Sequence, residues 1–356
     1  MKAAVYYGPG DIRIEEIDRP KVEDGVDGLG MVMKVEACGI CDIMDLPSYQ
    51  GIREYTNRGI TMGHEFAGEV VEVGPKVTVV KPGDRIYGMS IKPCLECDAC
   101  RAGNYAGCGN YHNLGAGHGI HGAFAKYMLY PFAMEGHIVK LPDNISYQDG
   151  SLIEVVRLSI GLGDKAKAGD VVAIVGLKIL GLATLARLKE KGIASKVIAI
   201  DTSKKRLEAA EKLGADVLID ATKDDIVEVV MKETSGKGAQ HVLETTGKPD
   251  IVDKAIAITA EGNVKTTPPL IGGTMWISQA FETPWTLKGM KGGTSISHPW
   301  GTIEGWSLFK ETVRFIQAGN IRAEHVVSHV FPLEKVTEAF ETAINDPDSN
   351  KVIIEP

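Results

Sequence analysis

Four cysteines at short spacings give the sequence its most specific chemical signal. They are Cys94, Cys97, Cys100 and Cys108. Four thiolates this close along the chain can surround one Zn²⁺ tetrahedrally from a single loop, which leaves no coordination position open for a substrate. The alternative is four unrelated buried or free cysteines, which the spacing disfavours. The motif therefore predicts a structural zinc site.

A second candidate site begins at His64 and Glu65, which place an imidazole and a carboxylate side by side. Both groups suit a borderline-soft cation such as Zn²⁺. The Val-rich run that follows is interrupted by Gly68 and Gly74, as in a strand that bends or that another backbone approaches closely. On its own, the pair is also compatible with two residues hydrogen-bonded near the surface. A catalytic zinc would need further ligands from separate segments and one position left for water or substrate.

The run from Gly63 to Val77 resembles the zinc signature of the medium-chain alcohol dehydrogenase family, Gly-His-Glu-x2-Gly-x5-Gly-x2-Val, with every fixed position present. The spacing of the four cysteines is similar to the structural-zinc lobe of the same family. The resemblance, which points to the sorbitol and threonine dehydrogenase-like branch, implies a catalytic zinc whose candidate ligands are Cys41, His64, Glu65 and Glu154.

Two of these candidates depend on the resemblance. Cys41 is the second cysteine of Cys38-Gly39-Ile40-Cys41, the position that binds metal in the family, and Cys38 is then expected to be a small buried residue. Glu154 matches a glutamate placed near zinc, although the proline that usually follows it is Val155 here. Its alternative role is a carboxylate favoured by the positive end of a following helix. The resemblance leaves open whether Glu65 or Glu154 contacts the metal.

The segment after Cys41 departs from the family pattern. The hydroxyl residue that relays the alcohol proton in relatives falls on Ile43 or Met44, neither of which can carry a proton, and an expected histidine is Pro47. We therefore expect the proton to leave slowly or through other groups. The candidates are Asp42, Ser48, Tyr49 and Glu65 with water.

A dinucleotide-binding turn is predicted where the strand-like Val171–Val175 meets a helix. The Gly-x-Gly-x-x-Gly motif occurs there as Gly176-x-Lys178-x-x-Gly181, and Asp201 ends the next strand. Asp201 is placed to bond the ribose hydroxyls and to repel a 2′-phosphate, which favours NAD, although it could instead cap the following helix. The other expected cofactor contacts are Ile179 and Leu180 in the turn, Arg206 at the adenine end and, by resemblance, Thr245 and Thr246.

Lys178 replaces the glycine that lets the backbone approach the pyrophosphate. Its side chain crowds that path, and a turn with positive φ would add strain on the order of 1 kcal/mol. Attraction between the ammonium and the phosphates opposes these effects by about 1 kcal/mol or less. From the sequence we expect Lys178→Gly to tighten NAD binding.

The pattern of elements predicts an α/β protein with two domains, as its 356 residues also suggest. Residues 1–155 consist of short strands between Gly, Pro and Asp turns. Strands and helices alternate over 156–295, which indicates a doubly wound parallel sheet. The resemblance identifies these as a GroES-like, mostly β catalytic domain, to which 296–356 returns, and a Rossmann domain.

Composition limits the partners. A formal net charge of -8 with scattered Lys and Arg disfavours nucleic acid, and no apolar run is long enough to span a membrane. The start of the chain lacks a targeting segment, and the cysteines cluster as metal ligands, so we expect a cytoplasmic protein. The resemblance implies a homodimer or homotetramer that associates through the cofactor domain.

The resulting hypothesis is a zinc-dependent, NAD-linked alcohol dehydrogenase with two Zn²⁺ per chain, acting on a secondary alcohol or polyol. A catalytically weak, NAD-binding member of the same fold is the alternative, suggested by Lys178, Ile43 and Pro47. A zinc-free reductase or lyase is disfavoured by the candidate zinc ligands. Four tryptophans, which could line a pocket or belong to the core, are Trp276, Trp285, Trp300 and Trp306.

Overall fold

The computed structural model describes residues 1–52, 55–94, 96–102, 108–110, 112–115, 120–260, 265–267 and 308–356. The chain separates into two compact units, one formed by Met1–Glu154 with Thr302–Pro356 and the other by Val155–Gly301. The first unit is thus completed by a segment that follows the second unit in the sequence. The four tryptophans and the expected boundary at 296 lie outside the described residues.

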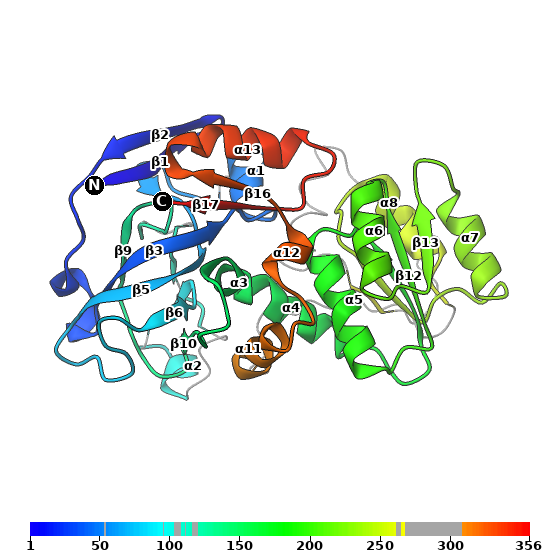
Figure 1. The fold of residues 1–356 in the computed structure, drawn as a ribbon, viewed down its shortest axis with the longest axis horizontal. Coiled ribbons are helices and arrows are strands. Elements are labelled where there is room, and N and C mark those ends of the chain that lie inside the picture. The colour runs from blue at the N-terminus through cyan, green and yellow to red at the C-terminus, as the bar shows by residue number, and fades with distance from the viewer. Residues whose placement is uncertain are drawn as a thin grey trace. The chain divides into compact units, whose positions relative to one another are not determined.

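Strands dominate the first unit (Figure 1). Its largest sheet runs in the order β10 (Ile138–Lys140), β6 (Arg85–Gly88), β5 (Glu65–Val73), β3 (Met31–Gly39), β17 (Lys351–Glu355) and β16 (Val327–Pro332), with β9 (Tyr127–Tyr130) also paired to β3. The smaller sheets are β2 (Asp11–Glu16), β1 (Lys2–Gly8) and β4 (Ile60–Thr61), and the pair β7 (Ile91–Lys92) and β8 (His112–Asn113).

Helices and 3-10 turns complete this unit. The helices are α1 (Asp45–Tyr49), α2 (Asp98–Arg101), α3 (Tyr147–Ser151), α11 (Phe309–Gln317), α12 (Ala323–Val326) and α13 (Val336–Asn345). The 3-10 turns are η1 (Val22–Asp24), η2 (Val26–Gly28) and η4 (Leu333–Lys335). Helix α4 (Ile153–Gly163) begins at the end of the first unit and continues into the second.

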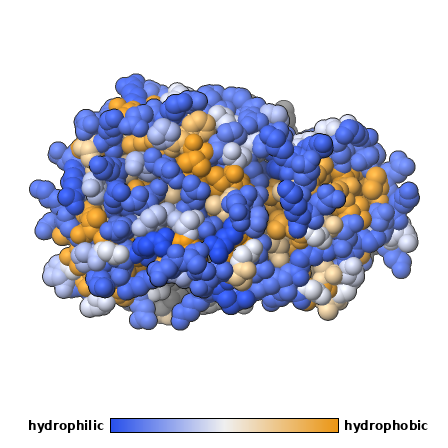
Figure 2. Space-filling model, viewed as in Figure 1, coloured by the Kyte–Doolittle hydropathy of each residue, from blue (hydrophilic) through white to orange (hydrophobic). Residues whose placement is uncertain are grey.

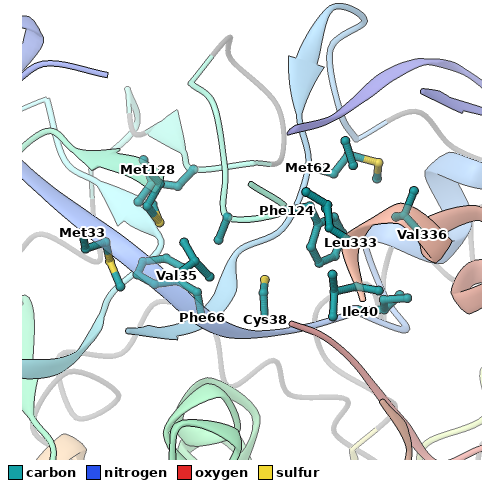
Figure 3. Packing of buried hydrophobic residues seen from close by; sticks show 14 of the residues in the cluster. Met33, Val35, Cys38, Ile40, Met62, Phe66, Phe124, Met128, Leu333 and Val336 are labelled. Atoms are coloured by element: carbon teal, nitrogen blue, oxygen red, sulfur yellow. The ribbon is translucent and has the colours of Figure 1, made fainter. Parts of the chain in front are cut away.

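The hydrophobic core of the first unit forms against β3 and β5. Val35 from β3, Phe66 from β5 and Val336 from α13 belong to one buried cluster, into which Cys38 also points (Figure 3). Cys38 is fully buried there, as expected from the sequence. Helix α3 packs against β3 and β5 as well, so both strands are covered by other elements. Burial of such apolar side chains stabilises the sheet that contains β5, the strand that begins at Glu65.

Gly68 and Gly74, which follow His64 and Glu65 in the sequence, are needed because other parts of the backbone come close to them. A Cβ at Gly68 would lie 2.0 Å from the carbonyl oxygen of Lys34, and one at Gly74 would lie 2.5 Å from that of Gly28. The ladder between β3 and β5 shifts register on both sides of this approach, as β-bulges do. The close approach predicted for this glycine-interrupted strand is confirmed.

The second unit contains a parallel sheet in the order β13 (Val217–Asp220), β12 (Lys196–Asp201), β11 (Val171–Val175), β14 (His241–Glu244) and β15 (Lys265–Thr267). The connecting helices are α5 (Ile179–Lys191), α6 (Lys204–Lys212), α7 (Ile226–Glu233) and α8 (Pro249–Ala257). Strand order reverses between β11 and β14, and right-handed crossovers then place α5 and α6 on one face and α7 and α8 on the other. The predicted doubly wound sheet is confirmed.

The face of the molecule seen in Figure 2 is mostly hydrophilic, with hydrophobic residues visible in several places on both units, including the region of β13. Leu218 on this edge strand is 36% exposed. None of the helices in the described part of the chain combines the length and hydropathy that crossing a bilayer requires.

One buried ion pair connects β17 to the start of β5. The ammonium of Lys351 pairs with a carboxylate oxygen of Glu65 and donates a hydrogen bond to the carbonyl oxygen of Ile40 at 2.7 Å. Burial disfavours the ammonium, but Glu65, Asp42 and Cys41 together outweigh burial, so that the net pKa of Lys351 is raised. A Cβ at Gly39 would lie 2.5 Å from Glu65 Oε2 and 2.7 Å from Lys351 Cε, so a larger residue there would have to displace the pair.

We expect Lys351→Met to lower the free energy of unfolding of chelator-treated protein by about 3–5 kcal/mol, because it leaves the Glu65 carboxylate buried without its counter-charge. Urea denaturation measures the change. Lys335→Met is the matched control, since Lys335 forms an exposed ion pair with Glu338 at 3.0 Å and should contribute about 1 kcal/mol or less. The double variant Glu65→Gln/Lys351→Met should recover most of the loss. A double variant as unstable as Lys351→Met would show that packing, not charge, is responsible.

Candidate metal centres and cofactor site

The pairing register of β3 and β5 brings Cys41 close to His64 and Glu65. Gly39 at the end of β3 pairs with Glu65 at the start of β5, so the chain leaving β3 and the chain entering β5 lie at the same end of the ladder. Ligand atoms of Cys41, His64 and Glu65 lie within 4.8 Å of one another, and all three residues are buried. A thiol, an imidazole and a carboxylate that converge in this way are a donor set suited to Zn²⁺.

The turn before His64 has a fixed conformation. Gly63 adopts a φ of +97°, a backbone region that other residues rarely enter. A Cβ there would also lie 2.8 Å from Phe124 Cδ1 and 2.9 Å from Cys38 Sγ. Glycine at this position therefore lets the chain turn tightly against the core and present His64 to Cys41.

Asp45, which the sequence analysis did not assign to the site, supports two of the candidate ligands. It is fully buried, accepts the Cys41 N–H at 2.9 Å, and its other oxygen lies 3.5 Å from His64 Nδ1. A carboxylate behind a histidine fixes the ring orientation at metal sites. Two signals in the sequence pointed to it: its place four residues after Cys41, and its match, with one inserted residue, to an aspartate of the family pattern.

The buried carboxylates and burial itself change the pKa values of the side chains in this cluster. Burial raises the pKa of Asp45 to about 6, although His64 opposes the shift. Burial alone lowers the pKa of His64, but Asp45 and two further carboxylates outweigh it, so that the net pKa is raised. Burial and the nearby carboxylates also raise the pKa of the Cys41 thiol. This excess of negative charge around Cys41 and His64 favours a bound cation.

Glu154 lies near the cluster but outside the three residues that converge. Its Oε1 accepts a hydrogen bond from Ser90 at 3.5 Å, and its charge raises the pKa of both Cys41 and His64. Glu65, by contrast, converges with Cys41 and His64 but is paired with Lys351. Both glutamates therefore remain candidates for contact with the metal.

The candidate residues for proton transfer differ in their hydrogen bonds and in their burial. The Ser48 hydroxyl donates to the Met44 carbonyl oxygen at 2.8 Å and accepts the Tyr55 N–H at 2.9 Å, so it is bonded within and beside α1. The Tyr49 hydroxyl donates to Glu341 at 2.8 Å. Asp42 is half-buried, and its charge contributes to the raised pKa of Lys351, which places it near the buried ion pair.

The four-cysteine motif gathers as a second cluster. The sulfur atoms of Cys94, Cys97, Cys100 and Cys108 lie within 4.8 Å of one another, and all four cysteines are free thiols. The Cys97 N–H points to Cys94 Sγ at 3.4 Å, and the Cys94 N–H points to Cys108 Sγ at 3.3 Å. Backbone N–H groups of Glu96 and Cys97 lower the pKa of Cys94 to about 6. Thiols that converge without forming disulfides fit a tetrahedral Zn²⁺ site.

The glycine-rich turn of the second unit follows β11 closely. Gly176 has a φ of +93°, and a Cβ there would lie 2.3 Å from Thr245 Oγ1. The Thr245 hydroxyl donates to the Gly176 carbonyl oxygen at 2.9 Å. Gly181 sits so close that its Cβ would lie 2.1 Å from the same oxygen. The turn and the first residues of α5, including the buried Ile179 and Leu180, are therefore packed as a dinucleotide-binding turn requires.

Lys178 occupies the N-cap of α5 with a φ of -64° and a ψ of -179°. This is ordinary extended backbone for any residue. The strain considered from the sequence depended on a positive φ, and that condition is not met.

The carboxyl ends of β12 and β14 carry the remaining candidates. Asp201 ends β12 and pairs with Arg206 at 2.7 Å. Glu244, which the sequence analysis did not assign to the site, ends β14 and accepts the N–H groups of Thr246 at 2.6 Å and Gly247 at 3.0 Å. Burial raises the pKa of Glu244. This carboxylate shapes the turn that contains Thr245 and Thr246.

Comparisons with known protein families find a match in each of the two units. Residues 29–143 match the family model described as alcohol dehydrogenase GroES-like domain, and residues 180–274 match zinc-binding dehydrogenase. The chain is 30% identical over 372 aligned positions to (R,R)-butanediol dehydrogenase of Bacillus subtilis, with all of both chains covered. It is 29% identical to sorbitol dehydrogenase of the same organism, over 97% of this chain and 94% of the other.

A solved structure gives the same result. The crystal structure of 2R,3R-butanediol dehydrogenase from Bacillus subtilis superposes with a TM-score of 0.79 at 27% identity, covering 100% of this chain and 99% of the other. The GroES-like unit and the Rossmann-like parallel sheet are therefore those of the matching models. Together with the relative at 30% identity, these matches show that the chain belongs to the zinc-containing medium-chain alcohol dehydrogenase family.

Proposed function

We propose that the protein is a zinc-dependent, NAD-linked dehydrogenase that transfers hydride reversibly between a secondary alcohol or polyol and the cofactor. One observation carries the proposal: Cys41, His64 and Glu65 converge, buried, from separate segments of the first unit. Among the similar proteins are ones named for butanediol and for sorbitol, which supports this class of substrate.

In this proposal Cys41, His64 and either Glu65 or Glu154 hold the catalytic zinc, and the four-cysteine cluster holds a structural one. When bound, the zinc supplies a Lewis acid for the alcohol oxygen, and NAD supplies the hydride acceptor. Asp45 keeps the Cys41 backbone and the His64 ring in position. All three candidate ligands are buried, so little water surrounds them. Electrostatic interactions between these ligands and a bound cation are therefore stronger than they would be in water.

The alcohol must also lose its hydroxyl proton. Ile43 and Met44 cannot accept it, and the Ser48 and Tyr49 hydroxyls are bonded to Met44 and Glu341. We therefore assign the proton to Asp42 or to Glu65, reached through water. Asp42 is the more exposed of the two and is the one that can pass a proton to solvent.

The central test combines zinc content with hydride transfer. We expect two zinc ions per chain by elemental analysis, and NAD reduction with secondary alcohols and polyols. His64→Ala should retain one zinc and lose hydride transfer, whereas Cys97→Ser should lose the other zinc and much of the stability. Cys38→Ala is the control, because Cys38 belongs to the hydrophobic core, and it should retain both ions.

Two outcomes would count against this proposal. No more than one zinc in fully loaded protein would remove one of the two sites. Nucleotide binding with zinc present but no hydride transfer to any alcohol would favour a catalytically weak, NAD-binding member.

The backbone of Lys178 changes the expectation for NAD affinity. With no strain at this position, the attraction between its ammonium and the pyrophosphate is opposed only by crowding. We expect Lys178→Gly to weaken NAD binding by up to about fivefold at low salt, with the deficit shrinking as salt rises. Titration calorimetry at two salt concentrations measures this.

Lys178→Met separates the two effects, since it keeps most of the side-chain bulk without the charge. If attraction dominates, both variants should bind NAD more weakly. Tighter binding by Lys178→Gly, with Lys178→Met no better than the unmodified protein, would show that crowding dominates after all.

We also propose a homodimer or homotetramer that works in the cytoplasm. Support for assembly comes from the structural-zinc relatives that this chain resembles, and the free cysteines suit a reducing compartment. Light scattering at micromolar concentration should give a mass of two or four chains, and a monomer would contradict the assembly.

A further inference from the structure

A buried carboxylate joins α3, the helix that precedes Glu154, to the segment 308–356 that returns to the first unit. Asp149 of α3 accepts a hydrogen bond from the Ala323 N–H at 2.7 Å through Oδ1. Its Oδ2 accepts from Arg322 Nη1 at 3.1 Å and from the Ser146 hydroxyl at 2.8 Å. Burial alone raises the pKa of Asp149, but the donors around it outweigh burial, so that the net pKa is lowered. Asp149 therefore serves as a charged acceptor that holds the start of α12 beside α3 (Figure 1).

Arg322 extends this connection to the loop before α3. Its Nη1 also donates to the carbonyl oxygen of Asn144 at 2.7 Å, and its Nη2 donates to that of Gln317 at 3.2 Å. The Gln317 amide in turn donates to Asn144 Oδ1 at 3.2 Å. Because a guanidinium is planar and holds its donors in a fixed fork, these contacts set a relative position as well as a distance. One side chain thus joins the end of α11, the start of α12 and the loop that enters α3.

Helix α3 also rests directly on the strand that begins at Glu65. A Cβ at Gly150 would lie 2.8 Å from Ala67 Cβ and 2.7 Å from Leu141 Cδ1, so the helix is in close contact with β5 two residues beyond Glu65. Glu154 follows Gly150 by four residues, in the first turn of α4. A displacement of α3 from β5 would therefore also displace Glu154 from the metal-binding cluster.

We propose that Arg322 is a positioning residue for the catalytic metal centre. Through Asp149 it holds α3 on β5, and α3 in turn holds Glu154 beside Cys41 and His64. This inference rests on the proposed function, in which that centre binds zinc. Residues that orient metal ligands from behind commonly change metal affinity by about tenfold or more when they are replaced. Loss of the guanidinium should therefore weaken zinc binding at this centre and leave the four-cysteine cluster unaffected.

The test measures zinc dissociation constants by chelator competition on the full chain. His64→Ala lacks the catalytic centre and so identifies which constant belongs to which ion. Arg322→Gln should raise the constant of the catalytic centre about tenfold and leave that of the four-cysteine cluster within about twofold. Arg314→Gln is the matched control on the same return segment, since Arg314 forms a partly exposed ion pair with Glu311 at 2.8 Å. It should leave both constants within about twofold.

A double-mutant cycle then shows whether Arg322 acts through Glu154. Glu154→Gln should itself raise the zinc dissociation constant of the catalytic centre. Adding Arg322→Gln to it should raise this constant by less than about threefold more, because the carboxylate that Arg322 positions is already gone. Independent effects that multiply in full would instead assign Arg322 a general role in stability and overturn the inference. Unchanged zinc affinity in either single variant would overturn it too.

Arg322→Lys decides the question if Arg322→Gln does not fold. It keeps a charged donor for Asp149 but loses the planar fork that bonds the carbonyl oxygens of Asn144 and Gln317 together. It should weaken zinc binding at the catalytic centre alone, and no longer do so in the Glu154→Gln background. A constant equal to that of the unmodified protein would count against the inference. Failure of the unmodified protein to hold zinc at Cys41 and His64 would overturn the proposed function itself.

Discussion

The start of β5, where the candidate metal ligand Glu65 lies, depends on a charge supplied by β17. Lys351 and Glu65 are almost completely buried, and neither charge would be tolerated there alone. The ammonium also bonds the carbonyl oxygen of Ile40, immediately before Cys41. One side chain of β17 therefore contacts both segments that supply the converging ligands, and a side chain at position 39 would displace the pair.

In the second unit, buried carboxylates hold the backbone turns at the carboxyl ends of β11 and β14. Asp201 bonds Leu177 in the glycine-rich turn, and Glu244 bonds Thr246 and Gly247 in the next turn along the sheet. Backbone N–H groups used in this way cannot rearrange without exposing a buried charge. The turns are consequently preorganised before any nucleotide binds, which reduces the entropic cost of binding.

Sequence patterns predicted the fold because its determinants are local. The change from short strands with Gly and Asp turns to alternating strands and helices is visible within windows of a few residues. The four-cysteine cluster was predictable for the same reason, since Cys94 and Cys108 lie close in the chain, and the glycine spacing after Glu65 anticipated the approach of Lys34. Asp45, Lys351 and Glu244 were not assigned to the sites, because their roles depend on strand register and on burial. Neither the φ of Lys178 nor the direction of the Asp201 oxygens can be deduced from residue type.

Lys351 is made long after Cys41, His64 and Glu65, and this order has a consequence for folding during protein synthesis. Lys351 and Ile40 are 311 positions apart, and the intervening chain includes the whole parallel sheet. The four cysteines, in contrast, all leave the ribosome within one short segment. The four-cysteine loop is therefore complete early in synthesis, whereas Cys41, His64 and Glu65 are made long before Lys351, the counter-charge of Glu65. During that interval the end of β3 at Cys38 and Gly39 lacks its partner strand β17, so this edge stays exposed until the last residues of the chain are made.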